Sequence, residues 1–318
     1  MTVHFILSGE TLESISEEIN LENPKYLKEF HNAHCAREDI IKDRIIAGKK
    51  LLLPDFKTIH EYNSRNDAPC KAPELNPDIP FSPEEFSKIY TVTINETEEN
   101  VLEKKNTRLT YTASVKWVRK EGTSHIFNVY KNNFFDAQGS MMSDLASESI
   151  RALNPFIVTT NEKGEILTIQ MNENARNHFE RIKDRLLDLF PDPYAAMYLD
   201  EFEFAVMNRD LFDRKMKEDI FMNLCFASLR NRFKNGKSFL RQFIEGENIW
   251  VDLMQKVEDR TDPAEIILRQ NEILYSDPHI AFDGKYNVLA ATGLVKKAEV
   301  SYTVTREDIK TSTSITIE

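Results

Sequence analysis

Cysteine and glycine are scarce in this sequence of 318 residues, and each shortage limits the kinds of binding site that the chain can form. The three cysteines (Cys35, Cys70 and Cys225) are odd in number and far apart, so neither a disulfide framework nor a four-ligand zinc site is expected. With nine glycines and no G-x-G-x-x-G or G-x-x-x-x-G-K-[ST] pattern, loops that cradle a phosphate are not predicted, and neither is a cofactor. The nucleophile motif G-x-S-x-G and the metalloprotease motif H-E-x-x-H are absent too, so we expect no enzyme activity.

Long apolar runs and an excess of positive charge are also missing. No apolar run approaches the roughly 20 residues that a membrane-spanning helix requires. The net charge is −11, from 52 acidic and 41 basic side chains without a dense basic block, so a nucleic-acid partner is not expected. Residues 1–7 lack the basic start and long apolar stretch of a signal peptide. A cytoplasmic location is therefore expected, with membership of a cell-envelope-associated assembly as the alternative.

Residues 3–54 form the most informative stretch. An apolar run at residues 3–7 predicts a strand, and it ends in a turn at Gly9. Thr11 is a suitable N-cap for a helix that begins at Leu12, and Asn23 followed by proline predicts the start of a second helix. Gly48 then allows a tight turn into a short strand at residues 50–53. The order is strand, helix, helix, strand.

Three motifs in this stretch resemble the LysM domain. Ser-Gly-Glu-Thr-Leu-x-x-Ile at residues 8–15 resembles the family's G-D-T-L-x-x-I opening, and Leu27 and Asn32 stand where the family carries its second-helix Leu and Asn. Residues 46–54, Ile-Ala-Gly-Lys-Lys-Leu-Leu-Leu-Pro, resemble the closing P-G-Q-x-L-x-I-P. The match covers residues 1–55, with Glu10, Ala47 and Lys49 in place of the family's Asp, Pro and Gln.

This resemblance implies a βααβ domain at residues 1–56 with a shallow groove between its two turns. The groove of this family holds N-acetylglucosamine units of peptidoglycan or chitin, through backbone polar groups and a small apolar floor. The alternative is that the same residues only build two turns in a module that contacts other proteins. The glycan-binding residues implied are Gly9, Glu10, Thr11, Leu12, Ile45, Ile46 and Ala47.

The remaining chain predicts a linker and a larger domain. Residues 57–83 are rich in proline and poor in large apolar residues, which predicts an extended linker. Strict alternation of apolar and polar residues at 108–117 predicts a strand. For residues 84–318 we expect strands at about 90–131, 156–170 and 286–317, with helices at about 172–274 between them. The predicted fold class is thus α+β: a small βααβ LysM-like domain plus a larger antiparallel-sheet domain with a helical insertion.

Three other groups of residues contain side chains that could form a metal or catalytic site. His31-x-x-His34-Cys35 could offer metal ligands, but histidines near a helix C-terminus also favour the helix dipole, and no metal site is predicted. The acidic run at residues 200–203 could supply a carboxylate pair for glycoside hydrolysis, yet it fits the solvated face of a helix. Cys225 lies among apolar residues, which predicts a buried, unreactive thiol. No catalytic residue is predicted.

Three functions follow from these observations. The first is a non-enzymatic protein that binds peptidoglycan-type glycans and docks a partner through its larger domain. The second is a structural, baseplate-type component of a phage-like contractile machine or bacterial secretion system, in which the module makes protein contacts. The third is a cell-wall hydrolase with an unrecognised catalytic domain.

Overall fold

The computed structural model describes residues 2–42, 45–65, 67–68, 76–100, 102–234, 236–244, 249–258, 262–273, 280–306 and 309–318. The chain divides into two compact units. The first, here called the N-terminal unit, holds residues 1–77 and 233–236; the second, the sheet unit, holds residues 78–232 and 237–318. No helix within the described ranges is long and apolar enough to cross a membrane.

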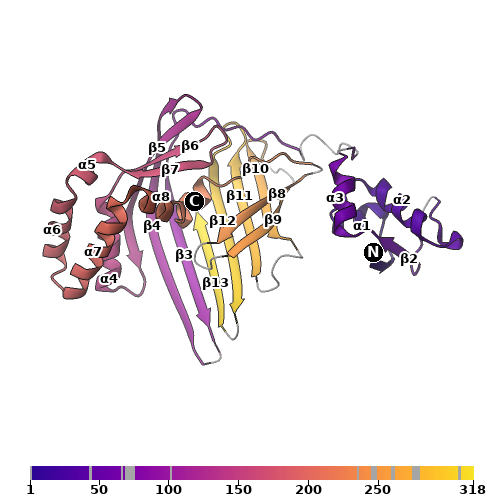
Figure 1. Cartoon of the computed structure of the whole chain (residues 1–318), viewed down its shortest axis with the longest axis horizontal. Coiled ribbons are helices and arrows are strands. Elements are labelled where there is room, and N and C mark those ends of the chain that lie inside the picture. Colours follow the sequence, from indigo (N-terminus) through magenta and orange to yellow (C-terminus); the bar gives the residue numbers. More distant parts are fainter. Residues whose placement is uncertain are drawn as a thin grey trace. The chain divides into compact units, whose positions relative to one another are not determined.

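The N-terminal unit contains a two-stranded antiparallel sheet and three α-helices in its described residues (Figure 1). Thr11 and Ser14 cap the first helix reciprocally, because each backbone N–H donates to the other side-chain oxygen. Asn23 caps the second helix, and Pro24 occupies its first turn. The elements are β1 (Thr2–Phe5), α1 (Leu12–Glu18), α2 (Pro24–His34), η1 (Arg37–Asp39), β2 (Lys50–Leu53) and α3 (Phe56–Ser64).

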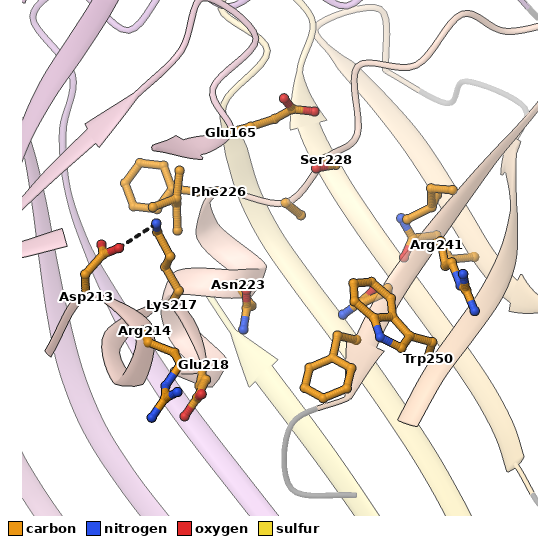
Figure 2. A pocket seen from close by; sticks show the side chains of 16 residues that line it. Glu165, Asp213, Arg214, Lys217, Glu218, Asn223, Phe226, Ser228, Arg241 and Trp250 are labelled. Carbon is orange, nitrogen blue, oxygen red and sulfur yellow. Dashed lines mark hydrogen bonds and ion pairs between the residues drawn. The ribbon is translucent and has the colours of Figure 1, made fainter. Parts of the chain in front are cut away.

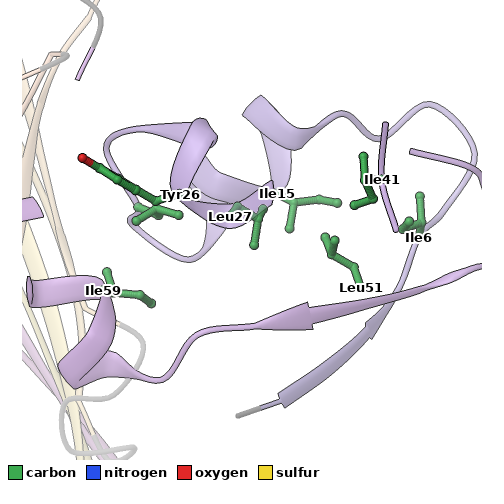
Figure 3. Close-up of a cluster of buried hydrophobic side chains, with 8 residues drawn as sticks. Ile6, Ile15, Tyr26, Leu27, Ile41, Leu51 and Ile59 are labelled. Carbon is green, nitrogen blue, oxygen red and sulfur yellow. The ribbon is translucent and has the colours of Figure 1, made fainter. Parts of the chain in front are cut away.

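One apolar cluster holds these elements together (Figure 3). Leu27 of α2 and Leu51 of β2 are fully buried at its centre, and Ile59 brings α3 into the same core. The buried members are Ile6, Ile15, Leu21, Tyr26, Leu27, Ile41, Leu51 and Ile59. Since α3 contributes to this core, the unit is not complete without the residues that follow β2.

The described residues of the sheet unit form one eleven-stranded antiparallel sheet, in the order β7-β6-β5-β4-β3-β13-β12-β11-β10-β9-β8. Two meanders meet where β3 pairs with β13, so that Val92 lies opposite Ile317. The strands are β3 (Ser87–Glu99), β4 (Lys104–Glu121), β5 (Ser124–Asp136), β6 (Phe156–Thr160), β7 (Ile166–Met171), β8 (Lys237–Ile244), β9 (Ile249–Val257), β10 (Glu265–Glu272), β11 (Ile280–Leu289), β12 (Val295–Arg306) and β13 (Ile309–Ile317).

Helices of the sheet unit lie in two insertions. The first is α4 (Met141–Ala152), between β5 and β6. The second runs from β7 to β8 and contains α5 (Glu173–Asn177), α6 (Phe179–Leu189), α7 (Pro193–Met207), α8 (Arg209–Lys217) and α9 (Ile220–Cys225). Helices α4 to α7 gather beside the sheet, and α8 lies across its face (Figure 1). Phe221 of α9 packs on Tyr90 of β3 with ring centroids 5.7 Å apart, so this insertion also covers the buried face.

The predicted fold class was wrong, because the helical insertion does not reach residue 274. Residues 249–257 and 265–272 lie within the range that was expected to be helical, but they form β9 and β10 and extend the sheet to eleven strands. In β9 the buried positions Val251, Leu253, Gln255 and Val257 keep a period of two, while exposed Trp250 and polar Gln255 hide that alternation in the sequence. Just before β10, the Asp262 side chain accepts from the Ala264 N–H in a tight turn.

The N-terminal part of that prediction also needs correction. A four-element βααβ domain was expected to end at residue 56, followed by an extended linker at residues 57–83. Helix α3 occupies the start of that range, and Ile59 is buried in the core of the unit. At its other end, buried Ile79 belongs to the sheet unit, and the Pro80 carbonyl accepts from Arg230 at 3.0 Å. The middle of the predicted linker, at residues 66 and 69–75, lies outside the described residues.

Candidate functional site

The two glycine turns of the N-terminal unit both require left-handed backbone. Gly9 has φ +93° and Gly48 has φ +85°, conformations that side chains with a Cβ rarely adopt. Each turn is closed by a backbone bond, from the Glu10 N–H to the Leu7 carbonyl at 3.4 Å and from the Lys49 N–H to the Ile46 carbonyl at 3.2 Å. Glycine is therefore needed in both places for conformation, since open space surrounds both positions.

Backbone hydrogen bonds place these turns side by side. The Gly48 N–H donates to the Ile6 carbonyl at 2.8 Å, and the Ile6 N–H donates to the Lys49 carbonyl at 3.0 Å. The first turn begins directly after Ile6, so the predicted residues of both turns belong to one region of the surface.

The surface at these turns combines apolar side chains with backbone polar groups. Leu7 is 64% exposed and Ile46 is 59% exposed, whereas Leu12 and Ile45 are half-buried against the core. Gly9, Thr11 and Ala47 are exposed and contribute small side chains or backbone. Leu7 was not among the predicted site residues; its place in the apolar alternation of residues 3, 5 and 7, just before a glycine turn, could have indicated it.

Glu10 serves its own turn. Its Oε2 accepts from the Leu7 N–H at 2.6 Å and contacts the His4 Nε2 at 2.8 Å. The hydrogen bond from His4, followed by that from the Leu7 N–H, lowers the pKa of the Glu10 carboxyl. Because both bonds involve Oε2, the Glu10 carboxylate stabilises the turn. It is therefore less available to a ligand than its predicted glycan-binding role implied.

Two side chains of α2 bind the backbone of the segment before the second turn and of β2 after it. Asn32 accepts from the Ile41 N–H at 2.8 Å and donates to the Ile41 carbonyl at 2.9 Å. His31 is buried; its Nδ1 accepts from the Leu52 N–H at 3.0 Å, and its Nε2 lies 2.9 Å from the Asp39 carbonyl. Both ring nitrogens of His31 are thus engaged within the protein, which explains its position without a metal. In the described residues, no group of three or more potential metal ligands occurs.

The acidic run at residues 200–203 and Cys225 do not form a catalytic arrangement: two of the acids bind a lysine, and the thiol is buried. Asp200 and Glu203 both contact Lys183, and these two hydrogen bonds raise the pKa of the Lys183 ammonium. The two carboxylates therefore share a cation instead of facing an open site. Burial raises the pKa of the Cys225 thiol to about 12, so the thiolate is not the form present near neutral pH.

A second candidate site is a cleft of about 640 Å³ in the sheet unit (Figure 2). Its walls come from the two edges of the sheet, β7 and β8, and from the α8–α9 segment between them. Phe226, Leu240, Phe243 and Trp250 supply apolar surface, and the last two rings pack with centroids 5.0 Å apart. The lining residues are Glu165, Ile166, Asp213, Arg214, Lys217, Glu218, Asn223, Phe226, Ala227, Ser228, Leu240, Arg241, Gln242, Phe243, Trp250 and Gln270.

Charged groups surround the apolar part of this cleft. Asp213 accepts from the Ile169 N–H of β7 at 2.6 Å and pairs with Lys217 at 2.7 Å, so it satisfies an edge-strand donor (Figure 2). Arg241 lies over the Trp250 ring at 5.3 Å and pairs with Asp252 at 3.4 Å. The lining acids Glu165, Asp213 and Glu218 are matched by three bases, Arg214, Lys217 and Arg241. The cleft therefore suits a ligand with an apolar body and a polar group of little net charge.

Sequence reasoning did not find the cleft. Its residues come from strands and helices between Glu165 and Gln270, and residues of β7 and β8, at opposite edges of the sheet, line the same cleft only in the folded chain. No local motif marks such a site.

Comparisons with known proteins assign no family. No protein-family model matches the chain, and no curated protein matches it. Among solved structures, one entitled "Lipid-protein interactions in lipovitellin" has a TM-score of 0.42 and 9% identity over 73% of this chain, which spans only 24% of that chain. A putative outer membrane lipoprotein-sorting protein domain from Vibrio parahaemolyticus has a TM-score of 0.19 and 8% identity, covering 72% of this chain and 85% of that chain. A DUF1329 family protein from Desulfovibrio piger has a TM-score of 0.21 and 10% identity, covering 73% and 85%. Such low identities and TM-scores assign neither a family nor a function to this chain.

Proposed function

We propose that this chain is a non-enzymatic binding protein. Its N-terminal unit binds an N-acetylglucosamine-containing glycan of the peptidoglycan type at the paired turns, and its sheet unit docks a protein partner. The observation that supports the glycan is the pairing of the two turns through Ile6, Gly48 and Lys49. That pairing gathers exposed Leu7 and Ile46 around open backbone at Gly9 and Ala47.

The chemistry of the glycan matches this surface. An acetamido group carries one N–H, one C=O and a methyl, so it requires backbone polar groups beside a small apolar patch. Leu7 and Ile46 are large enough to cover a methyl and part of a sugar ring. Gly9, with no side chain, lets a ligand approach the backbone closely.

The test is co-sedimentation of the full chain with purified peptidoglycan sacculi. Leu7→Glu and Ile46→Glu should each weaken retention about tenfold, because each replaces an apolar contact worth about 1.5 kcal/mol with a charge. Phe56→Glu is the matched control: Phe56 is 75% exposed in the same unit but follows the far end of β2. Point variants are preferable to removing residues 1–55, because Ile59 would then lose the core it packs against.

Equal retention of the wild type and both turn variants would refute glycan binding at this surface. It would favour the second function, a structural component of a contractile machine or secretion system whose N-terminal unit contacts proteins. A specific observation supports that alternative: Val3 and Phe5 of β1 are 48% and 58% exposed on the outer side of the small sheet. Under that alternative, Val3→Glu and Phe5→Glu should release the chain from its assembly, while sacculi retain neither the wild type nor the variants.

The cleft of the sheet unit supports a further binding role, for a single-chain amphiphile. Trp250 lines this cleft, and the other tryptophan, Trp117, lies on β4, so Trp117→Phe leaves a fluorophore at the site. Titration with dodecylphosphocholine below its micelle concentration should shift Trp250 emission in that variant. Ser228→Phe, which places a ring in the exposed mouth of the cleft, should abolish the shift, and Ser228→Ala should keep it. A shift that survives Ser228→Phe would argue against this site.

A further inference from the structure

Helix α7 is apolar on two sides, and only one of them is packed. Ala195, Leu199 and Val206 are buried, the first two in a cluster with residues of α4 and α6. A helix that is apolar all round is normally enclosed by other elements. In α7, however, the opposite side lies open: Tyr194 is 73% exposed and Phe204 is 70% exposed.

The exposed apolar residues of α7 lie along one line. Tyr194, Met197 and Phe204 are the large apolar members, Met197 being 63% exposed, and Glu201 stands between the last two. Positions 194, 197, 201 and 204 are spaced by three, four and three residues, so they share one helix face. This is the spacing of the seam that a helix presents to a second helix in a coiled coil. We call these four residues the α7 seam.

The charge of the α7 seam is negative at its centre. Helix α7 carries Asp200, Glu201 and Glu203 and contains no lysine or arginine. Lys183 pairs with Asp200 and Glu203, whereas Glu201 has no ion-pair partner among the described residues. A helix that covers the seam would have to compensate the Glu201 carboxylate, because burying an unpaired charge is costly.

A second copy of this chain fits the seam poorly. Two copies packed antiparallel about a two-fold axis would contact each other through the same residues. The midpoint of the seam lies at residue 199, so a two-fold axis there would bring both Glu201 carboxylates close to the axis, with no basic residue on either copy of α7 to pair with them. Like charges in such a contact repel each other and act against that pairing. The charge therefore favours a different partner with a basic residue at this position.

We propose that the α7 seam binds an amphipathic helix of a partner protein, with a Lys or Arg at the centre of its apolar face. Tyr194, Met197 and Phe204 contact the partner's apolar residues, and Glu201 pairs with its basic side chain. This names the docking surface of the sheet unit and rests on the partner-docking part of the proposed function. The experiment below measures helix binding alone, so its failure leaves the sacculus result untouched, and the reverse also holds.

The test uses two synthetic helical peptides of about 21 residues, or three heptads, with leucine along one seam. One peptide carries Lys at the central seam position and the other carries Glu. The full chain should bind the Lys peptide at least about tenfold more tightly, as measured by isothermal titration, because only that peptide neutralises Glu201. Glu201→Lys should reverse the preference, and Phe204→Glu should abolish binding of both peptides. Both residues are exposed, so unchanged thermal melts will show that the variants are folded.

Several outcomes would overturn the proposal. Equal affinity for the two peptides, or a preference that Glu201→Lys does not reverse, would show that the seam does not select a basic helix. A wild-type chain that sediments as a dimer and becomes monomeric with Phe204→Glu would identify a second copy as the occupant. Retention on phosphatidylcholine vesicles that Phe204→Glu removes would identify a lipid surface instead.

Discussion

Replacing Lys131 with Met should destabilise the sheet unit by about 3 kcal/mol, because it leaves a half-buried carboxylate without its ion-pair partner. Lys131 of β5 is 5% exposed and forms an ion pair with Asp219, which is 23% exposed. Asp219 also caps α9 by accepting from the Met222 N–H at 3.0 Å. The pair thus joins the sheet to the start of the helix that covers it, and neither member has full access to water.

The size of each expected loss in stability follows from the charged group that the substitution leaves unpaired. Breaking a buried ion pair by removing one partner costs about 3–5 kcal/mol. Without Lys131, Asp219 keeps the Met222 N–H and some contact with water, so the lower end applies. Asp219→Asn keeps the helix cap but strands the more deeply buried ammonium, and we expect a loss of about 4 kcal/mol. The double variant removes both charges and should lie within about 1 kcal/mol of the wild type, since Met fills the volume of the lysine stem.

Urea unfolding followed by tryptophan fluorescence measures these differences. Both tryptophans of the chain, Trp117 and Trp250, belong to the sheet unit, so the signal reports that unit alone. Lys183→Met is the matched control: this lysine is 21% exposed, its partners are more exposed, and its loss should cost no more than about 1 kcal/mol. Additive losses in the double variant, or single losses below about 0.5 kcal/mol, would refute the view that the Lys131–Asp219 pair is coupled and desolvated.

Three further predictions concern single groups. His31→Ala should destabilise the N-terminal unit by about 3 kcal/mol and speed hydrogen exchange of the Leu52 amide in β2, which donates to His31. His34→Ala loses one bond to its own helix and should cost less than about 1 kcal/mol. Equal effects of the two variants would contradict the buried role of His31. Cys225 should resist iodoacetamide at about pH 8 in the folded chain, because burial raises the pKa of its thiol to about 12, and rapid labelling found by peptide mass mapping would contradict that burial. Since the pKa of Glu10 is lowered in the folded chain, its contribution to stability is present above its ordinary value of 4.5 and is lost as the pH falls through the lower folded value. Amide chemical shifts in the first turn should follow that titration, and Glu10→Gln should remove it; a titration that persists in this variant would assign it to another group.

Local signals in the sequence located many elements of the fold. The cap at Thr11 starts α1, the Asn23-Pro24 pair starts α2, and the alternation at residues 108–117 lies within β4. These signals succeed because a cap or an alternating pattern depends on a few neighbouring residues. The ends of helices were harder to predict: helices were expected over residues 172–274, but α8 ends at Lys217, and α9 runs only from Ile220 to Cys225.

Predictions failed where pairing partners decide the structure. Residues 249–257 carry Trp250 and Met254 at positions that alternate with the buried ones, so apolar residues occur on both sides and fit a helix as well as a strand. Their pairing with β8 and β10 decides in favour of a strand. For the candidate site, the sequence indicated both glycine turns, but it did not show that the Glu10 carboxylate is engaged with His4 or that Leu7 is exposed beside the two turns.

The sequence by itself determined the two turns at Gly9 and Gly48, since their left-handed backbone is a property of glycine. It also determined the starts of α1 and α2 and the absence of the catalytic motifs sought. The tertiary structure alone decided the eleven-stranded sheet, because the pairing of β3 with β13 joins residues more than two hundred positions apart. It alone decided which side of α7 remains open, because both sides are apolar in sequence and only packing against α4 and α6 distinguishes them.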